Sequence, residues 1–343
     1  MFIVSAMFKV SLTDQDNKFT CSQDESILRS GLRAGFGLPY ECSTGSCGTC
    51  KFNLLSGAVE DSWPNAPGLT DRDRQKGRRL ACQSIPTTDC TIKIRQADTY
   101  VPIIQPYLQK VVLFGKNKLT RDMCEFQFVG SMPAQFRPGQ YALFKLPGVA
   151  GLRAYSMSNI LNESGDWSFY IKNKQGGSAS TMLFDDSYKI GQELLIDAPF
   201  GMGYLRNSPR DVVCIAGGSG LSPMISVARG MQADSFFKSH TLHFFYGGRQ
   251  PQDIYGEREL SVLDGYGELI HYHSSVSEAV DLGSAWKGRS GNIHDLVPET
   301  LPKCLSEYEF YFAGPPPMVD AVQRMLMIDH KIPFEQLHFD KFF

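Results

Sequence analysis

Several features that would assign the chain to a common class of protein are missing from its 343 residues. No apolar run reaches the roughly eighteen residues that a membrane-spanning helix requires, so no membrane segment is predicted. Neither sign of charge dominates, with 34 Lys and Arg against 36 Asp and Glu, so we expect neither nucleic acid nor an anionic membrane as a partner. The opening MFIVSAMFKVSL lacks the basic start and cleavage site of a signal peptide. We therefore expect a cytoplasmic protein.

The length is too great for one ordinary core, and neither an internal repeat nor a low-complexity segment is present, so several domains are predicted. Residues 1–97 contain an alternating strand, a short helix over 24–36, a cysteine-rich loop and a closing strand over 90–96. Residues 98–106 contain two prolines and little periodicity, which is typical of a linker.

Two further patterns divide the remainder of the chain. Residues 107–207 contain short strands separated by Gly, Pro, Asn and Asp, a pattern that predicts a small antiparallel β-barrel. Over 208–343 apolar strands alternate with helical stretches, which predicts a parallel α/β sheet. The predicted fold class is therefore α+β multidomain.

Nine cysteines are present, and without an export signal they favour thiol chemistry over disulfides. Cys42, Cys47 and Cys50 have the spacing C-x4-C-x2-C, and 31 residues separate Cys50 from a fourth cysteine, Cys82. Four thiolates in this spacing are the plant-type arrangement for a [2Fe-2S] cluster, with a zinc site or reactive thiols as the alternatives. The other five are expected to be small buried residues: Cys21, Cys90, Cys124, Cys214 and Cys304.

Two glycines interrupt the cysteine motif. Gly45 and Gly48 are predicted to adopt positive φ angles, because a backbone wrapped tightly around a cluster needs them. The motif PYECSTGSCGTC, together with SWPNAPGL, RLACQ and the ending LMIDHKIPFEQLHFDKFF, also carries a family resemblance.

The N-terminal part resembles a plant-type ferredoxin, or β-grasp, domain, and the rest resembles the ferredoxin-NAD(P)H reductase superfamily. Together they resemble the reductase components of bacterial multicomponent oxygenases, above all those of toluene-type di-iron monooxygenases. The resemblance implies a [2Fe-2S] cluster, FAD and NADH as cofactors. It also implies, as the partner of a monomeric reductase, the oxygenase (hydroxylase) component or its small Rieske-type ferredoxin.

In the barrel segment, RAYS matches the R-x-Y-[ST] pattern of this superfamily. The resemblance implies that Arg153 binds the FAD pyrophosphate, that Tyr155 stacks on the isoalloxazine, and that Ser156 forms a hydrogen bond near the reactive N5. A guanidinium pairs with phosphate through two hydrogen bonds, and an aromatic ring packs on a flat heterocycle, so the chemistry suits these residue types.

A second FAD-binding turn is implied in KNKQGGSAS. There Gly177-x-x-Ser180 matches the superfamily pattern, and glycine would let backbone N–H groups approach the pyrophosphate. Lys172 and Ser178 belong to the same implied site. A hairpin turn rich in small residues is the alternative interpretation.

The segment CIAGGSGLSPM joins an apolar strand to a helix through Gly217, Gly218 and Gly220, with Pro223 in the first helical turn. A helix N-terminus behind a glycine turn suits a dinucleotide pyrophosphate. Pro223 takes the position of the last glycine of G-x-G-x-x-G, so this is not the Rossmann fingerprint. It matches the G-G-[ST]-G-[IL]-x-P signature of the reductase superfamily.

The segment AGPPPM matches the superfamily's C-G-P-P-x-M segment beside the nicotinamide, which implies a role for Gly314 and Pro315. Ala313 replaces the usual cysteine, so no thiol role in hydride transfer carries over. Arg249 could meet a 2′-phosphate, but Asp253 lies close to it, and the resemblance favours NADH over NADPH.

The C-terminal Asp340 and Phe342 resemble the acidic-x-aromatic ending whose ring covers the flavin, although Phe343 adds one aromatic residue beyond that pattern. Ser156, Asp340 and Phe342 are therefore the expected catalytic residues. The alternative is a C-terminal strand that only packs its apolar face against the core.

Two further features carry less weight. His271 and His273 would lie on one face of a strand, but no further ligand is evident, so packing histidines are predicted. Arg78 and Arg79 are predicted to belong to a solvated loop near Cys82. The alternative is that they help to dock an acidic partner.

The main interpretation is an NADH-dependent reductase that passes electrons through FAD and a [2Fe-2S] cluster to a hydrocarbon (toluene, aromatic or alkene) monooxygenase. Flavin is the required intermediary because nicotinamide gives a hydride and a cluster accepts single electrons. The same machinery serving a Rieske ring-hydroxylating dioxygenase is one alternative. A flavin and iron-sulfur redox-sensing module is the other.

Overall fold

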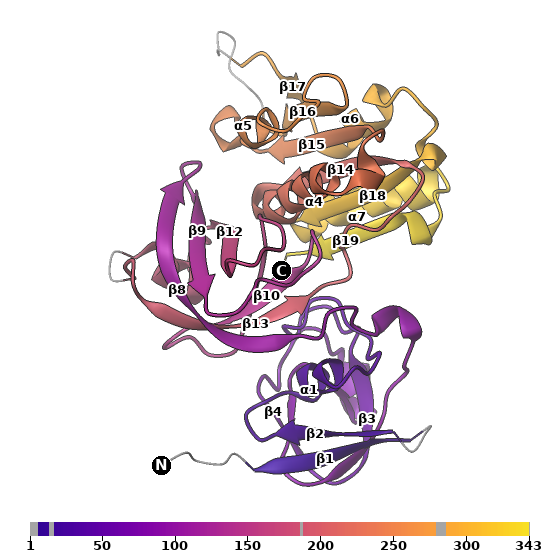
Figure 1. Ribbon diagram of the computed structural model, residues 1–343. Coiled ribbons are helices and arrows are strands. Elements are labelled where there is room, and N and C mark those ends of the chain that lie inside the picture. Colours follow the sequence, from indigo (N-terminus) through magenta and orange to yellow (C-terminus); the bar gives the residue numbers. More distant parts are fainter. Residues whose placement is uncertain (1–5, 14–16, 186–187, 279–285, 343) are drawn as a thin grey trace. The chain divides into compact units, whose positions relative to one another are not determined.

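We describe the protein from a computed structural model, in which residues 6–13, 17–185, 188–278 and 286–342 are described. The chain divides into two compact units, which can be followed by colour in Figure 1. The first unit comprises Met1–Leu108, Ala150–Ala154 and Asp197–Pro199, and the second comprises Gln109–Val149, Tyr155–Ile196 and Phe200–Phe343. Within the described residues, no helix is both long enough and apolar enough to cross a bilayer.

The first unit is built on a mixed five-stranded sheet in the order β2-β1-β7-β3-β5, in which β1 is parallel to β7. The strands are β1 (Met7–Leu12), β2 (Lys18–Ser22), β3 (Lys51–Ser56), β5 (Arg78–Leu80) and β7 (Cys90–Lys93); β4 (Val59–Asp61) pairs separately with β6 (Ser84–Pro86). The helices are α1 (Ile27–Arg33), α2 (Asp71–Gln75) and the 3-10 turn η1 (Asp98–Tyr100). The alternation predicted for β1 buries Val10 and Leu12, and Ile27 and Leu32 of α1 are buried as well.

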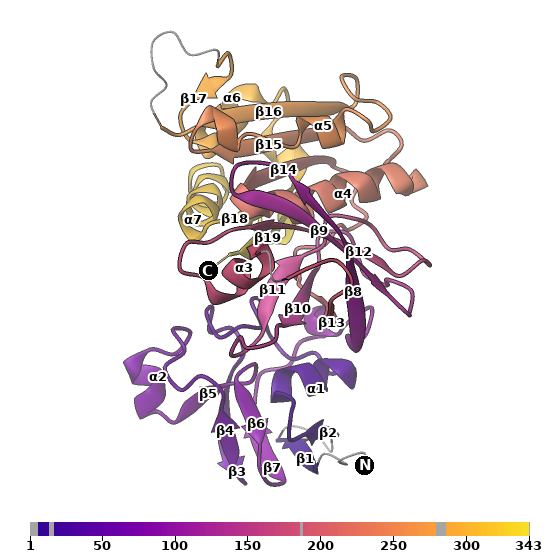
Figure 2. The same ribbon diagram turned by 90° about the vertical axis from the view of Figure 1, so that its left-hand side faces the viewer.

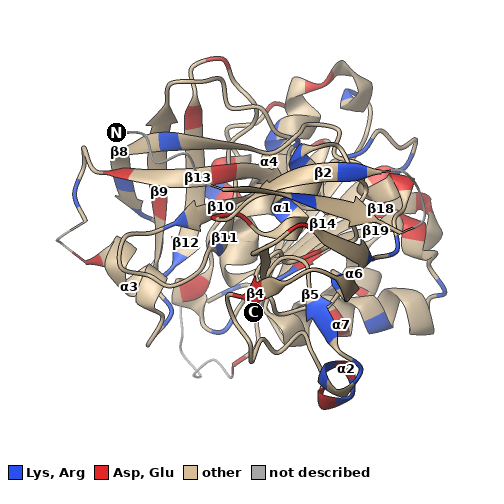
Figure 3. Ribbon diagram, turned by 90° about the horizontal axis from the view of Figure 1, so that it is seen from below, with Lys and Arg blue, Asp and Glu red and all other residues tan. Residues whose placement is uncertain are grey.

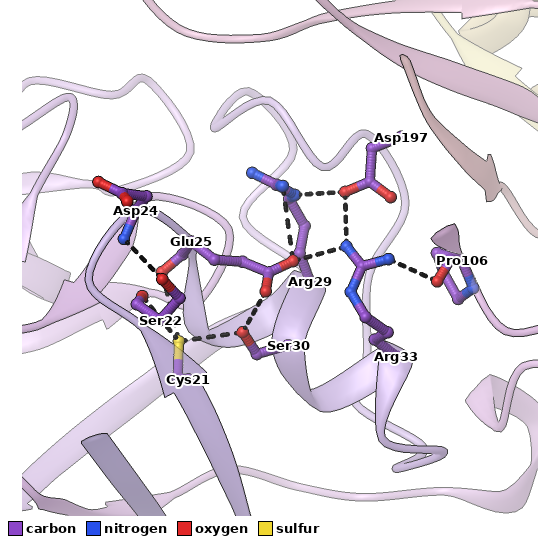
Figure 4. A network of polar contacts seen from close by, with 9 residues as sticks. All are labelled: Cys21, Ser22, Asp24, Glu25, Arg29, Ser30, Arg33, Pro106 and Asp197. Carbon is purple, nitrogen blue, oxygen red and sulfur yellow. Dashed lines mark hydrogen bonds and ion pairs between the residues drawn. The ribbon is translucent and has the colours of Figure 1, made fainter. Parts of the chain in front are cut away.

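A network of polar side chains in the first unit surrounds the buried carboxylate of Asp197, whose side chain is 1% exposed (Figure 4). Arg29 Nε and Arg33 Nη2 lie 2.7 and 2.9 Å from Asp197 Oδ2. Arg33 also contacts Glu25 Oε1 at 2.6 Å and donates to the carbonyl of Pro106 at 2.6 Å. A carboxylate buried to this extent needs such cationic partners to offset its lost hydration.

An antiparallel sheet follows in the order β11-β10-β13-β8-β9-β12, and most of its residues belong to the second unit. Its strands are β8 (Tyr107–Lys118), β9 (Met123–Gly130), β10 (Tyr141–Lys145), β11 (Arg153–Ser156), β12 (Asp166–Lys172) and β13 (Glu193–Phe200), and α3 (Ser178–Phe184) follows β12. The edge strands β11 and β12 meet at an antiparallel bridge between Met157 and Phe169, so the sheet is a nearly closed barrel. The rings of Phe128, Phe144 and Phe169 pack edge to face in its core.

The rest of the second unit is a parallel sheet in the order β17-β16-β15-β14-β18-β19. Its strands are β14 (Asp211–Gly217), β15 (Leu242–Gly248), β16 (Ile270–Val276), β17 (Arg289–Ser290), β18 (Tyr308–Gly314) and β19 (Leu337–Lys341). The α-helices are α4 (Leu221–Ala233), α5 (Glu257–Leu260), α6 (Ile293–Thr300) and α7 (Pro316–Arg324). A π-helical turn, η6 (Met325–Asp329), follows α7. The 3-10 turns are η2 (Gly218–Gly220), η3 (Ser235–Phe237), η4 (Pro251–Asp253), η5 (Leu305–Glu307) and η7 (Phe334–Gln336).

Both faces of this sheet are covered, which explains why its central strands are apolar throughout rather than alternating. Helices α4 and α5 pack on one face through residues such as Met224 and Leu260. Helices α6 and α7 pack on the other face through Ile293 and Val319 (Figure 2). The predicted combination of ferredoxin-like domain, antiparallel barrel and parallel α/β domain is confirmed.

Candidate functional site

The four predicted cluster cysteines lie in one region of the first unit. Cys42, Cys47 and Cys50 follow α1 in the loop before β3, and Cys82 follows β5. The Cys47 N–H donates a hydrogen bond to Cys42 Sγ at 3.3 Å, and Gln83 Nε2 lies 3.6 Å from Cys82 Sγ. Cys50 and Cys82 are buried, and the other two are half-buried.

The thiols interact in two pairs. A hydrogen bond from the Cys47 side chain lowers the pKa of the Cys42 thiol to about 6, against the opposing effect of burial. A hydrogen bond with Cys50, followed by burial, raises the pKa of the Cys82 thiol. Among the described residues, no three His, Cys, Asp or Glu side chains form a site for one metal ion. Two pairs of thiols suit a cluster of two irons, because each iron takes two protein thiolates.

The loop around these thiols depends on the predicted glycine geometry. Gly45 and Gly48 have φ angles of 92° and 80°, as expected from the sequence. A Cβ atom on Gly48 would lie only 2.4 Å from the carbonyl oxygen of Gly68, and Gly68 N–H donates to the carbonyl of Gly45 at 2.9 Å. The SWPNAPGL segment therefore supports the cysteine loop directly.

The basic residues near Cys82 have acidic partners of their own. Figure 3 shows both signs of charge interspersed on α2 and neighbouring elements. Arg78 Nη1 lies 2.8 Å from Asp73 Oδ1, and Arg79 forms an ion pair with Asp61. The two arginines are in the strand β5 rather than in the loop expected from the sequence, and their ion pairs tie this strand to α2 and β4. Docking of an acidic partner stays a hypothesis.

The strand β11 carries the predicted flavin residues. Arg153 Nη1 donates to the carbonyls of Ala150 and Leu152, at 3.0 and 3.1 Å. The ring of Tyr155 packs edge to face on Phe144, with 4.9 Å between the ring centroids. Ser156 is 5% exposed, so it lies in the protein interior while its neighbours on the strand are more open.

The second predicted FAD turn begins α3, where Gly177 is the N-cap and Ser178 is the first helical residue. Gly177 has a φ of −82°, and the left-handed residue of the turn is Gly176, with a φ of 72°. Ser180 Oγ lies 3.0 Å from the N–H of Lys174 and donates to its carbonyl at 3.1 Å, which stabilises the turn. Gly177 therefore begins the helix, and the positive φ angle of the turn is at Gly176, which the motif match did not include.

Lys172 is at the end of β12, and its Nζ lies 3.1 Å from Asp122 Oδ2. Its Cδ atom lies 3.8 Å from the ideal Cβ position of Gly218, so the lysine stem is adjacent to the glycine loop. The barrel and the parallel sheet therefore bring Lys172 and Gly218 together across 46 residues of chain.

The glycine loop packs tightly against the end of β18. Gly218 has a φ of 55°, and α4 begins at Leu221, so Pro223 is in the first turn as predicted. A Cβ atom on Gly220 would lie 1.9 Å from the carbonyl oxygen of Ala313. Only glycine at position 220 allows this approach of the loop to the strand.

The C-terminal residues reach the same place. Gly314, with a φ of 155°, ends β18, and Pro315 precedes α7. The N–H of Phe342 donates to the carbonyl of Gly314 at 2.9 Å, and Asp340 of β19 is opposite Ala313 in the parallel ladder. Phe342 is partly buried and packs against the core that contains Ala313, so the C-terminal strand docks on this core. Phe343 lies outside the described residues.

The residues expected to distinguish the two nicotinamide cofactors have different environments. Arg249, after β15, is exposed. Asp253 is 5% exposed, lies 3.0 Å from Arg121 Nε and accepts from the N–H of Gln250 at 3.1 Å. Its carboxylate is thus engaged within the protein.

Sequence reasoning missed two features. Ser222 joins α4 to the barrel: its hydroxyl donates to the carbonyl of Ser156 at 2.7 Å, a contact that no local pattern signals. The second is His243 on the adjacent strand β15, which stacks on both His271 and His273, with centroid distances of 5.0 and 5.7 Å, in agreement with the packing role predicted for these two histidines. The rings lie nearly parallel, so they pack on one another.

Family models match the three parts of the chain separately. Residues 10–87 match the 2Fe-2S iron-sulfur cluster binding domain, residues 110–204 the oxidoreductase FAD-binding domain, and residues 214–324 the oxidoreductase NAD-binding domain. The chain therefore contains domains for all three predicted cofactors.

Relatives match over almost the whole chain. The ferredoxin–NAD(P)(+) reductase CarAd of Metapseudomonas resinovorans is 41% identical, over 94% of this chain and 96% of its own. The ferredoxin–NAD(+) reductase component of the alkene monooxygenase system of Xanthobacter autotrophicus is 36% identical, over 94% and 97%. A solved structure of the ferredoxin reductase in carbazole 1,9a-dioxygenase superposes with a TM-score of 0.89 at 38% identity, over 98% of this chain and 99% of that one. The chain therefore belongs to the family of ferredoxin–NAD(P)+ reductases that serve oxygenase systems.

Proposed function

We propose that this reductase takes electrons from NADH and delivers them to the oxygenase component, or the small Rieske-type ferredoxin, of a multicomponent hydrocarbon monooxygenase. Two observations in one chain carry the proposal. The four thiols form the pairs Cys42–Cys47 and Cys50–Cys82, and the glycine loop at Gly218 lies next to Lys172 of the barrel strand β12. When bound, FAD accepts a hydride from the nicotinamide and releases electrons singly to the cluster.

Cys42, Cys47, Cys50 and Cys82 would hold the cluster. Their pairing supports this assignment, and the positive φ angles of the loop let backbone N–H groups turn toward sulfur, as the Cys47 N–H does toward Cys42. Hydrogen bonds to sulfur stabilise the more negative cluster and so help to set its potential.

The FAD would be held by residues of β11 and of the turn before α3. Arg153 would bind the pyrophosphate, Tyr155 would stack on the ring system, and Ser156 would position a hydrogen bond near its reactive edge. The remaining proposed contacts are Lys172, Gly177, Ser178 and Ser180. The ion pair of Lys172 with Asp122 and the fixed hydroxyl of Ser180 hold two of these groups in place before any cofactor binds.

The NADH would bind along the loop of Gly217, Gly218, Gly220 and Pro223, which leads into α4. Backbone N–H groups at this helix start, other than that of the proline, would face the pyrophosphate. Gly314 and Pro315 would form the adjacent wall at the end of β18, with Phe342 held there by its hydrogen bond to Gly314. Asp340, opposite Ala313, would fix the register of this C-terminal strand.

We propose NADH rather than NADPH as the donor, with Arg249 in contact with the adenosine end. Arg249 directly follows β15 and is exposed, whereas Arg121, the other arginine at this segment among the described residues, is paired with the buried Asp253. A single exposed arginine gives a weaker 2′-phosphate site than the clusters of basic residues that phosphate groups favour.

We also propose that residues 1–97 form the ferredoxin domain, 98–106 the linker, 107–207 the FAD domain and 208–343 the NAD domain of a cytoplasmic monomer. Cluster-binding and nicotinamide-binding residues would then be in separate domains, with the FAD domain between them in the sequence.

The test is an anaerobic titration of the purified protein with NADH, followed by visible absorption and low-temperature EPR. Bleaching of a flavin band together with a reduced [2Fe-2S] signal supports the complete path. Flavin bleaching without a cluster signal would contradict the assignment of the four cysteines. Faster reduction by NADPH than by NADH would contradict the assignment of the donor.

A second candidate has a specific basis, because one solved relative is the ferredoxin reductase in carbazole 1,9a-dioxygenase. The same chain could serve a Rieske ring-hydroxylating dioxygenase, and exchange of purified oxygenase components would separate the two. A redox-sensing module, the third candidate, predicts slow turnover, so rapid NADH-driven reduction of ferricyanide would exclude it.

A further inference from the structure

The seam where the barrel closes contains a side chain from outside the barrel. Met157, which follows β11, forms an antiparallel bridge with Phe169 in the middle of β12, so Ser156 and Tyr170 are the next opposed residues. The hydroxyl of Ser222, from α4, accepts the N–H of Tyr170 at 3.0 Å and donates to the carbonyl of Ser156 at 2.7 Å. One hydroxyl thus connects both edge strands to the parallel-sheet domain.

Two further side chains of α4 continue this row. Ser226 and Arg229 follow Ser222 by four and seven residues, which places all three on one face of the helix. Ser226 Oγ donates to the carbonyl of Asn159 at 2.6 Å, and Arg229 Nη1 donates to that of Ser158 at 2.9 Å. Three side chains therefore hold the chain segment that continues from β11.

Ser222 differs from the other two in what it joins. It contacts Ser156 itself, and it lies two residues after Gly220 of the glycine loop. It is 1% exposed, so water cannot replace its hydroxyl without a local opening. Ser226 is also buried, at 0% exposure, but its contact is three residues beyond Ser156.

We propose that Ser222 is a positioning residue for hydride transfer, which couples the loop that binds the nicotinamide cofactor to the strand that binds the flavin. The inference rests on the proposed function of these two segments. Hydride transfer requires reacting atoms about 3–3.5 Å apart, and a misplacement of about 1 Å can slow such a reaction about 100-fold. The hydrogen bonds of the Ser222 hydroxyl fix the distance between the start of α4 and the strand β11.

The test compares anaerobic stopped-flow reduction of the bound flavin by NADH in three variants of the full chain. Ser222→Ala should lower the limiting rate of flavin reduction at least tenfold, which corresponds to about 1.4 kcal/mol of barrier, while the Kd for NADH changes less than about threefold. Ser222→Thr keeps the hydroxyl and should recover most of the rate. Ser226→Ala, the matched control, should lower thermal stability by a similar amount and change the rate less than about threefold.

The outcomes separate the inference from the function on which it rests. If NADH does not reduce the flavin of the wild-type protein, the proposed function fails. If the wild type is reduced but Ser222→Ala and Ser226→Ala have the same rate, or if Ser222→Thr is as slow as Ser222→Ala, the positioning role is refuted. Should Ser222→Ala not fold, Ser222→Cys, with its weaker donor, must still show a reduced rate, and a wild-type rate would refute the role.

Discussion

Replacement of Gly220 by alanine tests the packing of the glycine loop against β18. The new Cβ atom would lie 1.9 Å from the carbonyl oxygen of Ala313, 2.4 Å from its carbonyl carbon and 2.8 Å from the nitrogen of Gly314. All three are backbone atoms in or at the end of a central strand, so no side-chain rotation can relieve the contact. Since Cβ atoms essentially never approach closer than 3.0 Å, the loop and the strand must separate by about 1 Å.

Two effects of different size follow from this separation. Overpacking in a rigid region typically costs about 1–3 kcal/mol, so the free energy of unfolding of Gly220→Ala should fall by that amount. A shift of about 1 Å in the loop that holds the cofactor should lower kcat/KM for NADH by about 100-fold. The assays are urea unfolding and NADH-driven ferricyanide reduction.

The matched control is Gly218→Ala in the same loop. Gly218 has a φ of 55°, but its nearest neighbour at the Cβ position is the flexible Lys172 Cδ at 3.8 Å. Its substitution therefore costs about 1–2 kcal/mol of backbone strain without a clash. The reasoning would be refuted if Gly220→Ala retained both the stability and the kcat/KM of the wild type, or if it were less damaging than Gly218→Ala.

Three further predictions concern other parts of the molecule. Cys82→Ser should abolish the EPR signal of the reduced cluster while NADH-driven flavin reduction continues, and Cys90→Ser, a buried cysteine elsewhere, should preserve the signal. Phe342→Ala should change the affinity for NADH and the visible flavin spectrum, and an unchanged affinity and spectrum would indicate that the ring only packs. Burial, followed by the charges of His271 and His273, lowers the pKa of His243 to about 4, so the unfolded chain takes up this proton first as the pH falls. The free energy of unfolding should therefore decline between about pH 6.5 and 4, less steeply in His243→Gln, and equal slopes in urea titrations across this range would contradict the prediction.

Much of the fold could be predicted because its signals are local. The alternation in β1 placed Val10 and Leu12 in the core, and the apolar strands followed by helical stretches predicted the parallel sheet. Gly45 and Gly48 were identified from their place in the cysteine motif, and their positive φ angles are confirmed. At the second implied FAD turn the motif match named Gly177 but did not reveal that its neighbour Gly176 is left-handed, because such a match does not fix the dihedral angle of each residue.

The sequence by itself determined the cofactor chemistry, since C-x4-C-x2-C and the glycine loop place their functional groups within a few residues of one another. Only the tertiary structure decided which distant groups meet: Cys82 with Cys50, Gly220 with Ala313, and Ser222 with both Ser156 and Tyr170. These contacts join residues that are 32 to 93 positions apart in the sequence. Periodicity and local spacing report only the neighbours along a strand or helix, whereas these pairs arise from the way in which whole elements pack.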